Sequence, residues 1–159
     1  MIRRDILDAC CGSRMMWFDK ENPRTVFADI RQEAMTLCDG RWCKVKPDTV
    51  ADFRAMPFAD GEFSLVVFDP PHLVRAGEES WLRKKYGVLD PDNWQDDVRK
   101  GFAECWRVLR PGGTLVFKWS DLQVKLGEVL PLMPARPLFG FRRGRGIFVV
   151  LNKPHGEAE

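Results

Sequence analysis

The sequence predicts a single α/β domain organised around an open sheet, and three observations support this fold class. The run Leu65–Phe68 is unbroken and apolar and ends at an acid and two prolines, as a strand buried on both faces does. Two shorter β-like runs, residues 5–9 and 25–29, also carry an acid at or near their ends. Apolar residues at helical spacing between residues 90 and 109 place a long helix among these strands.

The first predicted strand and the loop after it have the chemistry of a site for a nucleotide-like ligand. Asp8 lies near the end of the strand, and Gly12 lies in a loop of small residues that lets a ligand approach the backbone closely. We expect an apolar helix to begin near residues 15–18, because the free N–H groups of a helix N-terminus bind such ligands. The Gly-x-Gly-x-x-Gly pattern of dinucleotide-binding folds is absent, which argues against a nicotinamide-dependent enzyme.

The second predicted strand, Thr25–Asp29, also ends in an acid, about 20 residues after Asp8. An acid at this separation, at the tip of the neighbouring strand, binds ribose hydroxyls in nucleotide-binding folds, because one carboxylate accepts from two vicinal hydroxyls. The alternative is an acid that is merely solvated at a strand end. The spacing favours the ligand-binding role.

The next segment predicts a hairpin and a short strand. The Asp-Gly pair at residues 39–40 favours a β-hairpin within residues 36–45, because such two-residue turns need positive φ at both positions. A short third strand of the main sheet follows near residues 48–52. It is expected to end at an acid, Asp52, with the aromatic Phe53 directly after it.

The long helix is expected from residue 90 to Leu109. Asp90 or Asp92 can cap its N-terminus, and its apolar stripe is core packing. A glycine-containing turn then leads into a fifth strand at residues 114–117.

Two further strands, Leu138–Phe141 and Ile147–Leu151, are expected near the end of the chain, after a helix that Asp121 caps and that ends near residue 130. The turn between these strands is cationic and flexible, which suits contact with backbone phosphates, although basic turns are often merely solvated. Its three arginines are Arg142, Arg143 and Arg145.

Residues 73–89 are expected to be irregular, and loops of this length in a small domain are usually functional or disordered. Aromatic residues interleaved with cations suit stacking on bases while phosphates are held, and a plain lid is the alternative. The candidate substrate-binding residues of this stretch are Arg75, Trp81, Lys84, Lys85 and Tyr86. Lys118, at the exit of the fifth strand, is expected to lie near the same edge of the sheet.

The composition is that of an ordinary soluble domain, with 45% hydrophobic and 30% charged residues. No apolar run approaches the length of a membrane span and the start of the chain does not resemble a signal peptide, so no membrane contact is expected. Five cysteines without paired Cys-x-x-Cys spacing favour reduced structural thiols in a cytoplasmic protein and argue against a bound metal.

The order of the motifs resembles that of class I S-adenosylmethionine-dependent methyltransferases over residues 5–119. The tetrad Asp69-Pro70-Pro71-His72 resembles the Asp/Asn-Pro-Pro-aromatic motif of amino-methyltransferases, which methylate planar nitrogens such as the exocyclic amine of adenine. Asp8 and Gly12 match the first motif of the class, whereas Arg14 stands where a further glycine is common. The run Val108–Gly113 also resembles the class, and the likeness extends to small phage-type DNA adenine methyltransferases.

The resemblance implies S-adenosyl-L-methionine as cofactor and a set of residues that hold it. In the pattern of the class, the acid at Asp52 contacts the adenine amino group of the cofactor and the neighbouring Phe53 packs on the ring. The implied cofactor-binding residues are Asp8, Ala9, Cys10, Gly12, Asp29, Asp52, Phe53 and Asp69.

The resemblance also implies one Rossmann-like methyltransferase domain over residues 1–159. Such a domain is a three-layer sandwich around a seven-stranded, mostly parallel sheet in which only the last strand is antiparallel. No large target-recognition domain is evident in the sequence. Three outcomes follow from this: relaxed specificity for DNA, recognition through a homodimer or a partner subunit, or another substrate.

The implied reaction is methylation of an adenine amine in a nucleic acid, in DNA first and in RNA second, with a glutamine side chain as a further planar amine. Asp69 and the Pro70 carbonyl would accept the two N–H bonds of the amine, and His72 would stack on or orient the base. The catalytic residues are therefore Asp69, Pro70, Pro71 and His72. The competing class is a non-catalytic cofactor-binding subunit, which would be expected to lack this tetrad.

Overall fold

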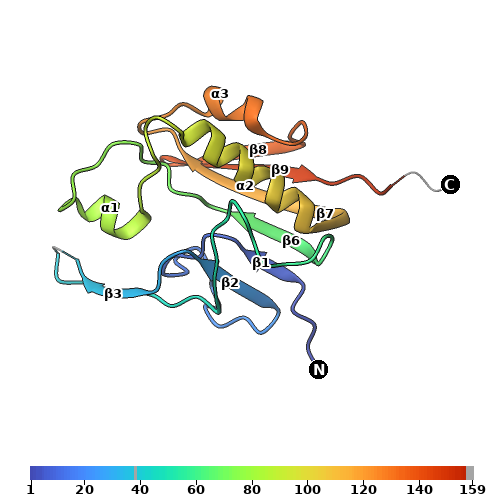
Figure 1. Cartoon of the computed structure of the whole chain (residues 1–159), viewed down its shortest axis with the longest axis horizontal. Coiled ribbons are helices and arrows are strands. Elements are labelled where there is room, and N and C mark those ends of the chain that lie inside the picture. The colour runs from blue at the N-terminus through green and yellow to red at the C-terminus, as the bar shows by residue number, and fades with distance from the viewer. Residues whose placement is uncertain (38, 157–159) are drawn as a thin grey trace.

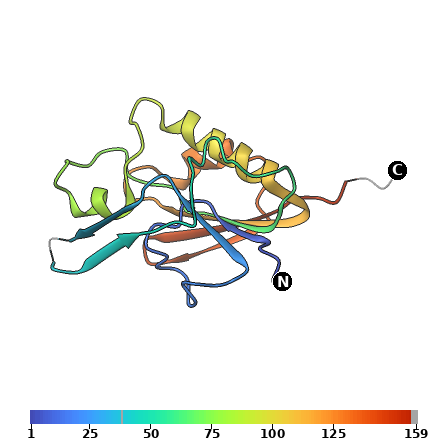
Figure 2. The same cartoon turned by 60° about the horizontal axis from the view of Figure 1, so that its bottom comes forward.

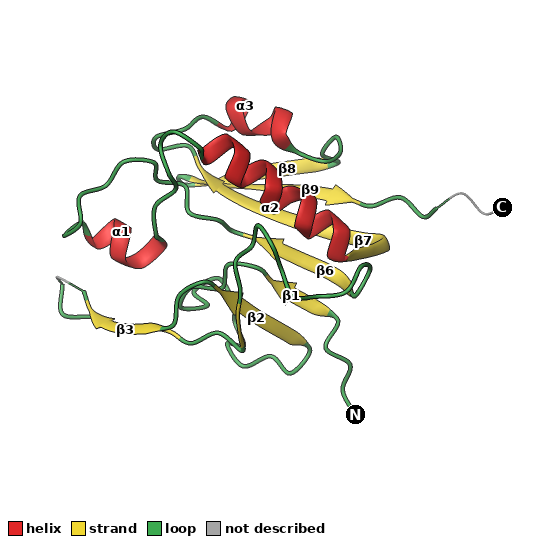
Figure 3. Ribbon diagram, in the orientation of Figure 1, coloured by secondary structure: helices red, strands yellow, loops and turns green. Residues whose placement is uncertain are grey.

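The core of the structure is a seven-stranded sheet with the strand order β5-β2-β1-β6-β7-β9-β8 (Figures 1 and 3). This computed structural model describes residues 1–37 and 39–156. The pairs from β5 to β7 are parallel, whereas β9, the last strand in the sequence, is antiparallel to both of its neighbours. The predicted mostly parallel sheet with an antiparallel last strand is confirmed. Its strands are β1 (Ile6–Asp8), β2 (Thr25–Asp29), β5 (Thr49–Val50), β6 (Phe63–Phe68), β7 (Leu109–Ser120), β8 (Phe139–Arg143) and β9 (Gly146–Asn152).

Alternate residues of the central strands form the hydrophobic core with helix α2 (Trp94–Val108). Val66 of β6 and Leu115 of β7 are register partners on this face, and both are fully buried. Gly101 lets the helix approach β6 closely, because a Cβ there would lie 2.5 Å from the Phe68 ring. The core thus fixes the strand that carries the predicted catalytic residues against a long helix.

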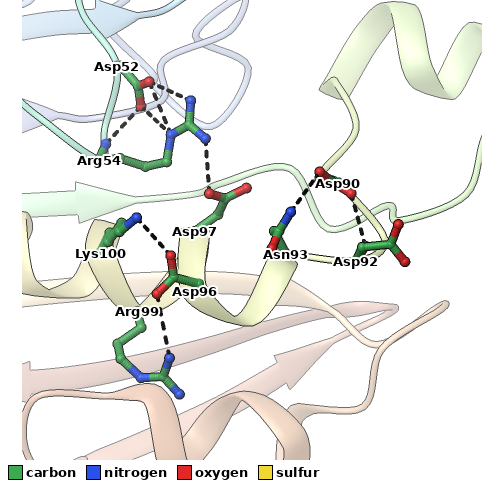
Figure 4. A network of polar contacts seen from close by, with 9 residues as sticks. All are labelled: Asp52, Arg54, Asp90, Asp92, Asn93, Asp96, Asp97, Arg99 and Lys100. Carbon is green, nitrogen blue, oxygen red and sulfur yellow. Dashed lines mark hydrogen bonds and ion pairs between the residues drawn. The ribbon is translucent and has the colours of Figure 1, made fainter.

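The start of α2 differs from the expectation. The helix begins at Trp94 rather than near residue 90, and neither predicted cap residue caps it. The Asp90 carboxylate accepts hydrogen bonds from the backbone N–H of Asp92 and from the side-chain amide of Asn93 (Figure 4). These local bonds stabilise a turn that leads into the helix.

The segment 73–89, expected to be irregular, contains helix α1 (Trp81–Tyr86). Gly87 follows the helix with a φ of 77°, a conformation that favours glycine. A Cβ at Gly87 would lie 3.3 Å from the Pro71 ring, so the chain returns from α1 directly against the proline turn after β6.

The helix predicted to begin at Asp121 is much shorter. It comprises α3 (Leu126–Val129) and the 3-10 turn η1 (Leu130–Leu132). Asp121 does not cap it, because its carboxylate pairs with the Arg142 guanidinium of β8 at 2.8 Å. Among the described residues, no helix combines the length and apolar character that a bilayer crossing requires.

Residues 9–24 cover the opposite face of the sheet over β1 and β2 (Figure 2). The prediction of a helix near residues 15–18 is wrong, because this segment forms turns only. Arg14 has a φ of 57°, which no α-helix accepts, and Trp17 turns back to pack edge-on against Phe27, with 5.1 Å between ring centroids. Since α2 and α3 lie together on the other side of the sheet in Figure 2, this loop takes the place of a helix in the third layer.

The predicted β-hairpin is confirmed as a separate two-stranded sheet, β3 (Glu33–Thr36) and β4 (Trp42–Val45). The connection is longer than the expected two-residue turn, since the Leu37 N–H bonds to the Arg41 carbonyl and the Gly40 N–H to the Leu37 carbonyl. Cys38 lies outside the described residues.

Candidate active site

Three aspartates stand at the carboxyl ends of adjacent strands and surround two cavities. Asp8 ends β1, Asp29 ends β2 and Asp69 directly follows β6, at the edge where open α/β sheets bind ligands. The first cavity has a volume of about 90 Å³ and the second of about 230 Å³. Four residues line both cavities: Cys10, Arg31, Asp69 and Tyr86. The first cavity is also lined by Asp8, Gly12 and Pro70. The second is also lined by Ala9, Asp29, Phe53 and Pro71.

Asp8 is 1% exposed, and its carboxylate is held from two sides. Its Oδ2 accepts from the Trp17 indole N–H at 2.7 Å, and its Oδ1 accepts from the Cys10 backbone N–H at 3.2 Å. Burial raises the pKa of Asp8 to about 7, against the lowering effect of the Trp17 hydrogen bond, and the nearby Asp69 carboxylate raises it further. Near neutral pH, the charge of the site therefore depends on Asp8.

The loop after β1 keeps a glycine-like backbone at two positions. Gly12 has a φ of 50° and donates its N–H to Asp29 Oδ2 at 2.9 Å. Arg14, which replaces a common glycine of the class, has a φ of 57° in the same left-handed region. Its guanidinium lies 3.8 Å above the Phe27 ring and donates to the Lys46 carbonyl at 2.8 Å, so it fastens the loop away from the cavities. The departure from the motif thus preserves the space beside Gly12.

Asp29 is 5% exposed and is joined to Arg31, an arginine that no sequence motif singles out. Its Oδ1 accepts from the backbone N–H of Arg31 at 2.9 Å and from the Arg31 Nε at 3.2 Å. Arg31 also donates from Nη1 to the Lys84 carbonyl of α1 at 3.2 Å, and it lines both cavities. The pattern Asp-x-Arg is a local signal for this turn, because an aspartate readily bonds the backbone two residues ahead.

Asp52, predicted to contact the cofactor, is used differently from Asp29. Its two oxygens accept from the backbone N–H, Nε and Nη2 of Arg54, and Arg54 continues to Asp97 of α2 at 2.9 Å (Figure 4). The hydrogen bonds from Arg54 lower the pKa of Asp52, and its side chain is 31% exposed. Asp52 lines neither cavity, whereas the neighbouring Phe53 lines the second one beside Asp29.

Asp69 is paired with a lysine from the next strand. Lys118 of β7 donates from Nζ to Asp69 Oδ2 at 3.1 Å. Burial raises the pKa of Asp69, and the ammonium of Lys118 opposes that rise. The prediction that Lys118 lies at this edge is therefore confirmed by geometry, and its contact is with the catalytic candidate itself.

His72, the fourth residue of the tetrad, lines neither cavity. Its ring faces those of Tyr86 and Trp119, with 5.3 and 6.4 Å between centroids. Burial lowers the pKa of His72 to about 4, and the charge of Lys118 acts in the same direction, so the ring is neutral at pH 7. Tyr86, by contrast, lines both cavities and forms the wall that His72 supports.

The predicted substrate-binding residues of the 73–89 segment separate into two groups. Lys85 lines the first cavity with Tyr86, and its Nζ lies 5.0 Å from the centroid of the Tyr86 ring. Lys84 pairs with Glu79 at 2.8 Å, and Trp81 is 40% exposed and lines neither cavity. Arg75 is exposed and lines neither cavity.

The turn between β8 and β9 lies at the same edge of the sheet as Lys118. Gly146, at the start of β9, pairs with Ser120 at the carboxyl end of β7. Arg142 is held by Asp121, and the other two arginines of the turn, Arg143 and Arg145, are exposed. The structure thus brings the turn near the active edge without placing its cations in either cavity.

Gln123 is a second residue that the sequence did not reveal. Its side-chain Oε1 accepts from the backbone N–H groups of Val74 and Arg75 at 2.8 and 2.9 Å, and its Nε2 donates to the Arg75 carbonyl at 2.7 Å. These three bonds hold the chain that leaves the tetrad. Because these bonds join residues far apart in the sequence, no local sequence pattern predicts them.

Neither a protein-family model nor a curated protein matches the sequence. Solved structures do match in fold. The PH0226 protein from Pyrococcus horikoshii has a TM-score of 0.63 at 17% identity, over 96% of this chain and 82% of that chain. The 1,6-didemethyltoxoflavin-N1-methyltransferase of Burkholderia thailandensis, solved with S-adenosylhomocysteine, has a TM-score of 0.59 at 13% identity, over 96% and 72%.

A SAM-dependent methyltransferase from Leishmania major has a TM-score of 0.57 at 11% identity, over 94% of this chain and 65% of that chain. This chain has the class I methyltransferase fold. At these identities the likeness concerns the fold alone, and one fold can carry many chemistries.

Proposed function

We propose that this protein transfers a methyl group from S-adenosylmethionine to the exocyclic amine of adenine in DNA. The observation that carries the proposal is the position of Asp69-Pro70-Pro71, because Asp69 lines both cavities while the two prolines face one cavity each. A substrate amine and a cofactor could therefore meet at this carboxylate.

The residues around the cavities fit the proposed cofactor. Phe53 offers a ring face to the adenine in the second cavity, and Asp29 beside it retains acceptor capacity for a ribose hydroxyl. A carboxylate has about four lone-pair sites, of which Gly12 and Arg31 occupy three of those on Asp29. The cofactor's ammonium and sulfonium are cationic, and the buried carboxylate of Asp8 lines the first cavity, which suits such groups.

The chain's contribution to the reaction is alignment and charge stabilisation. When bound, S-adenosylmethionine supplies a methyl group already activated on a sulfonium. Asp69 Oδ1 and the Pro70 carbonyl accept the two N–H bonds of the amine, which places its nitrogen and stabilises the positive charge that develops on it. Such alignment supplies on the order of 7–11 kcal/mol. Because burial raises the pKa of Asp69, its carboxylate is equipped to take the proton that the methylated nitrogen releases.

The target base has to leave its stack to reach this edge, at a cost of a few kcal/mol in a duplex. Tyr86 at the cavity wall, supported by His72, provides a ring for the displaced base. Stacking on such rings contributes about 1–3 kcal/mol per base. Because His72 is neutral at pH 7, its ring can pack beside Tyr86 without charge repulsion from Lys118.

The experiment that tests the proposal is transfer of labelled methyl from S-adenosylmethionine to DNA, RNA, protein and small-molecule pools, followed by mass spectrometry of the product. N6-methyladenine in DNA is the expected product. Label in adenine of RNA would assign RNA as the substrate, and label in another amine would assign the molecule that carries that amine. Cofactor binding without transfer to any pool would favour a non-catalytic partner subunit.

Two substitutions at Asp69 sharpen the assignment. Asp69→Ala removes the acceptor and is expected to lower kcat by at least about a thousandfold, with cofactor affinity nearly unchanged. Asp69→Asn retains one acceptor oxygen, as the Asp/Asn form of the motif does, and is expected to keep measurable activity. Equal loss of transfer and cofactor binding in Asp69→Ala would contradict the assigned role.

A further inference from the structure

The β3–β4 hairpin presents an exposed cationic and aromatic side. Along β4 the side chains alternate, with Cys43 and Val45 buried and Trp42 and Lys44 exposed. Trp42 is 68% exposed, which is unusual for the largest apolar side chain. A strand that buries one side and leaves a tryptophan and a lysine on the other has a surface available for a ligand.

A groove runs between this hairpin, the loop after β1 and helix α1. It has a volume of about 300 Å³, and its cationic residues are Lys20, Arg41, Lys44 and Lys85. Among the described residues, no aspartate or glutamate lines it. Arg41 pairs with Asp39, whereas Lys20 and Lys44 form no ion pair within residues 1–37 and 39–156.

The groove is continuous with the catalytic edge at one end. Ser13, Met15 and Lys85 line both the groove and the cavity that contains Asp69 and Pro70. Ser13, Lys20 and Lys44 are also shared with a wider hollow of about 660 Å³. The wider hollow adds Lys46 and two acids, Asp48 and Glu21, of which Asp48 is paired with Arg4 and Arg14.

We propose that this groove holds the phosphate backbone of the DNA strand that flanks the target adenine, with Trp42 stacking on a neighbouring base. The inference rests on the proposed function and adds to it a surface that holds the DNA around the target base. Lys20 and Lys44, which form no ion pair within the described residues, suit phosphates, and the exposed indole of Trp42 beside them suits a base. The β3–β4 hairpin is thereby the DNA-contacting element.

The test measures affinity for a duplex that contains the target adenine, with S-adenosylhomocysteine present, over a range of salt concentrations. Lys20→Gln/Lys44→Gln is expected to lower the slope of log K against log salt by about 2, because each lost phosphate contact removes about 0.9. The control is Arg99→Gln/Lys100→Gln on α2, which removes two exposed cations that do not line the groove. The control is expected to leave the slope unchanged.

The aromatic contact has its own pair of variants. Trp42→Ala is expected to weaken DNA binding about 5- to 100-fold, whereas Trp42→Phe, which keeps a stacking ring, should lose much less. Cofactor affinity should be unchanged in all four variants, which serves as the check that each one is folded.

The outcomes separate the two proposals. If the wild-type protein binds and methylates DNA but the lysine pair behaves as the control does, the groove assignment is overturned and the proposed reaction stands. If the wild-type protein binds DNA with no salt dependence, the groove assignment also fails. If the lysine pair alters binding of an RNA of the same sequence but not of DNA, the choice of DNA is overturned, and methyl transfer to no nucleic acid overturns the proposed function itself.

Discussion

The chain segments that follow β2 and β5 carry the same local pattern, an aspartate and an arginine two residues later, but they serve different parts of the molecule. In both, the aspartate accepts from the backbone N–H and the guanidinium of its arginine. Arg31 then reaches the Lys84 carbonyl on α1, beside the cavities, whereas Arg54 reaches Asp97 on α2 (Figure 4). One turn therefore lies beside the cavities and the other is joined to helix α2, and the long-range partner of the arginine makes the difference.

The largest effect that separates the two turns is expected in cofactor affinity. Asp29→Ala should weaken binding of S-adenosylhomocysteine about 100-fold, because a charge-assisted hydrogen bond to ribose is lost and Arg31 is left without its carboxylate. Asp52→Ala should change the same Kd less than about threefold. Isothermal titration calorimetry on both variants measures the contrast. Comparable losses would show that Asp52 contacts the cofactor after all.

A second contrast is expected in the pH dependence of that affinity. A cationic cofactor favours the ionised form of Asp8, whose pKa is about 7, so affinity for S-adenosylmethionine should rise with pH and level off above pH 7. Below pH 7 the expected loss approaches tenfold per pH unit. Asp8→Asn should remove this dependence, and it also corrects for titration of the ligand itself.

The turn joined to α2 should not contribute to that profile. Because Arg54 lowers the pKa of Asp52, this carboxylate stays ionised over the pH range in which Asp8 titrates. Asp52→Asn should therefore keep the wild-type dependence of cofactor affinity on pH. A profile that flattened in Asp52→Asn but not in Asp8→Asn would reverse the comparison.

The smallest expected effect concerns stability. Arg54→Met should lower the free energy of unfolding by about 1–2 kcal/mol, because Asp52 and the mostly buried Asp97 lose their shared partner. Cofactor affinity should stay at the wild-type value. Lys100→Met, which breaks an exposed pair with Asp96 on the same helix, is the control and should cost less than about 0.5 kcal/mol. Urea denaturation with and without ligand distinguishes these results.

The sequence was sufficient for the parts of the site that depend on strand order. Asp8, Asp29 and Asp69 follow from apolar runs that end in an acid, because the carboxyl ends of parallel strands meet at one edge of the sheet. The long helix follows from local periodicity and the hairpin from its Asp-Gly pair, whereas the seven-stranded sheet was implied by the resemblance to class I methyltransferases. These features need no knowledge of distant contacts.

The parts that could not be predicted depend on such contacts. Gln123 holds the tetrad segment from another loop, and Arg31 is fastened to α1, so neither position is set by its sequence neighbours. The helix expected near residues 15–18 is overridden by Trp17, whose indole bonds to Asp8 and whose ring packs on Phe27. Tertiary packing decides such segments against their local propensity.

The two faces of the sheet are supported in different ways. On one face, helix α2 packs against β6 and β7, whereas on the other the loop 9–24 carries the groups that fasten Asp8 and Asp29. A change in this loop therefore alters how two of the three aspartates are held, while Asp69 follows a strand that α2 supports.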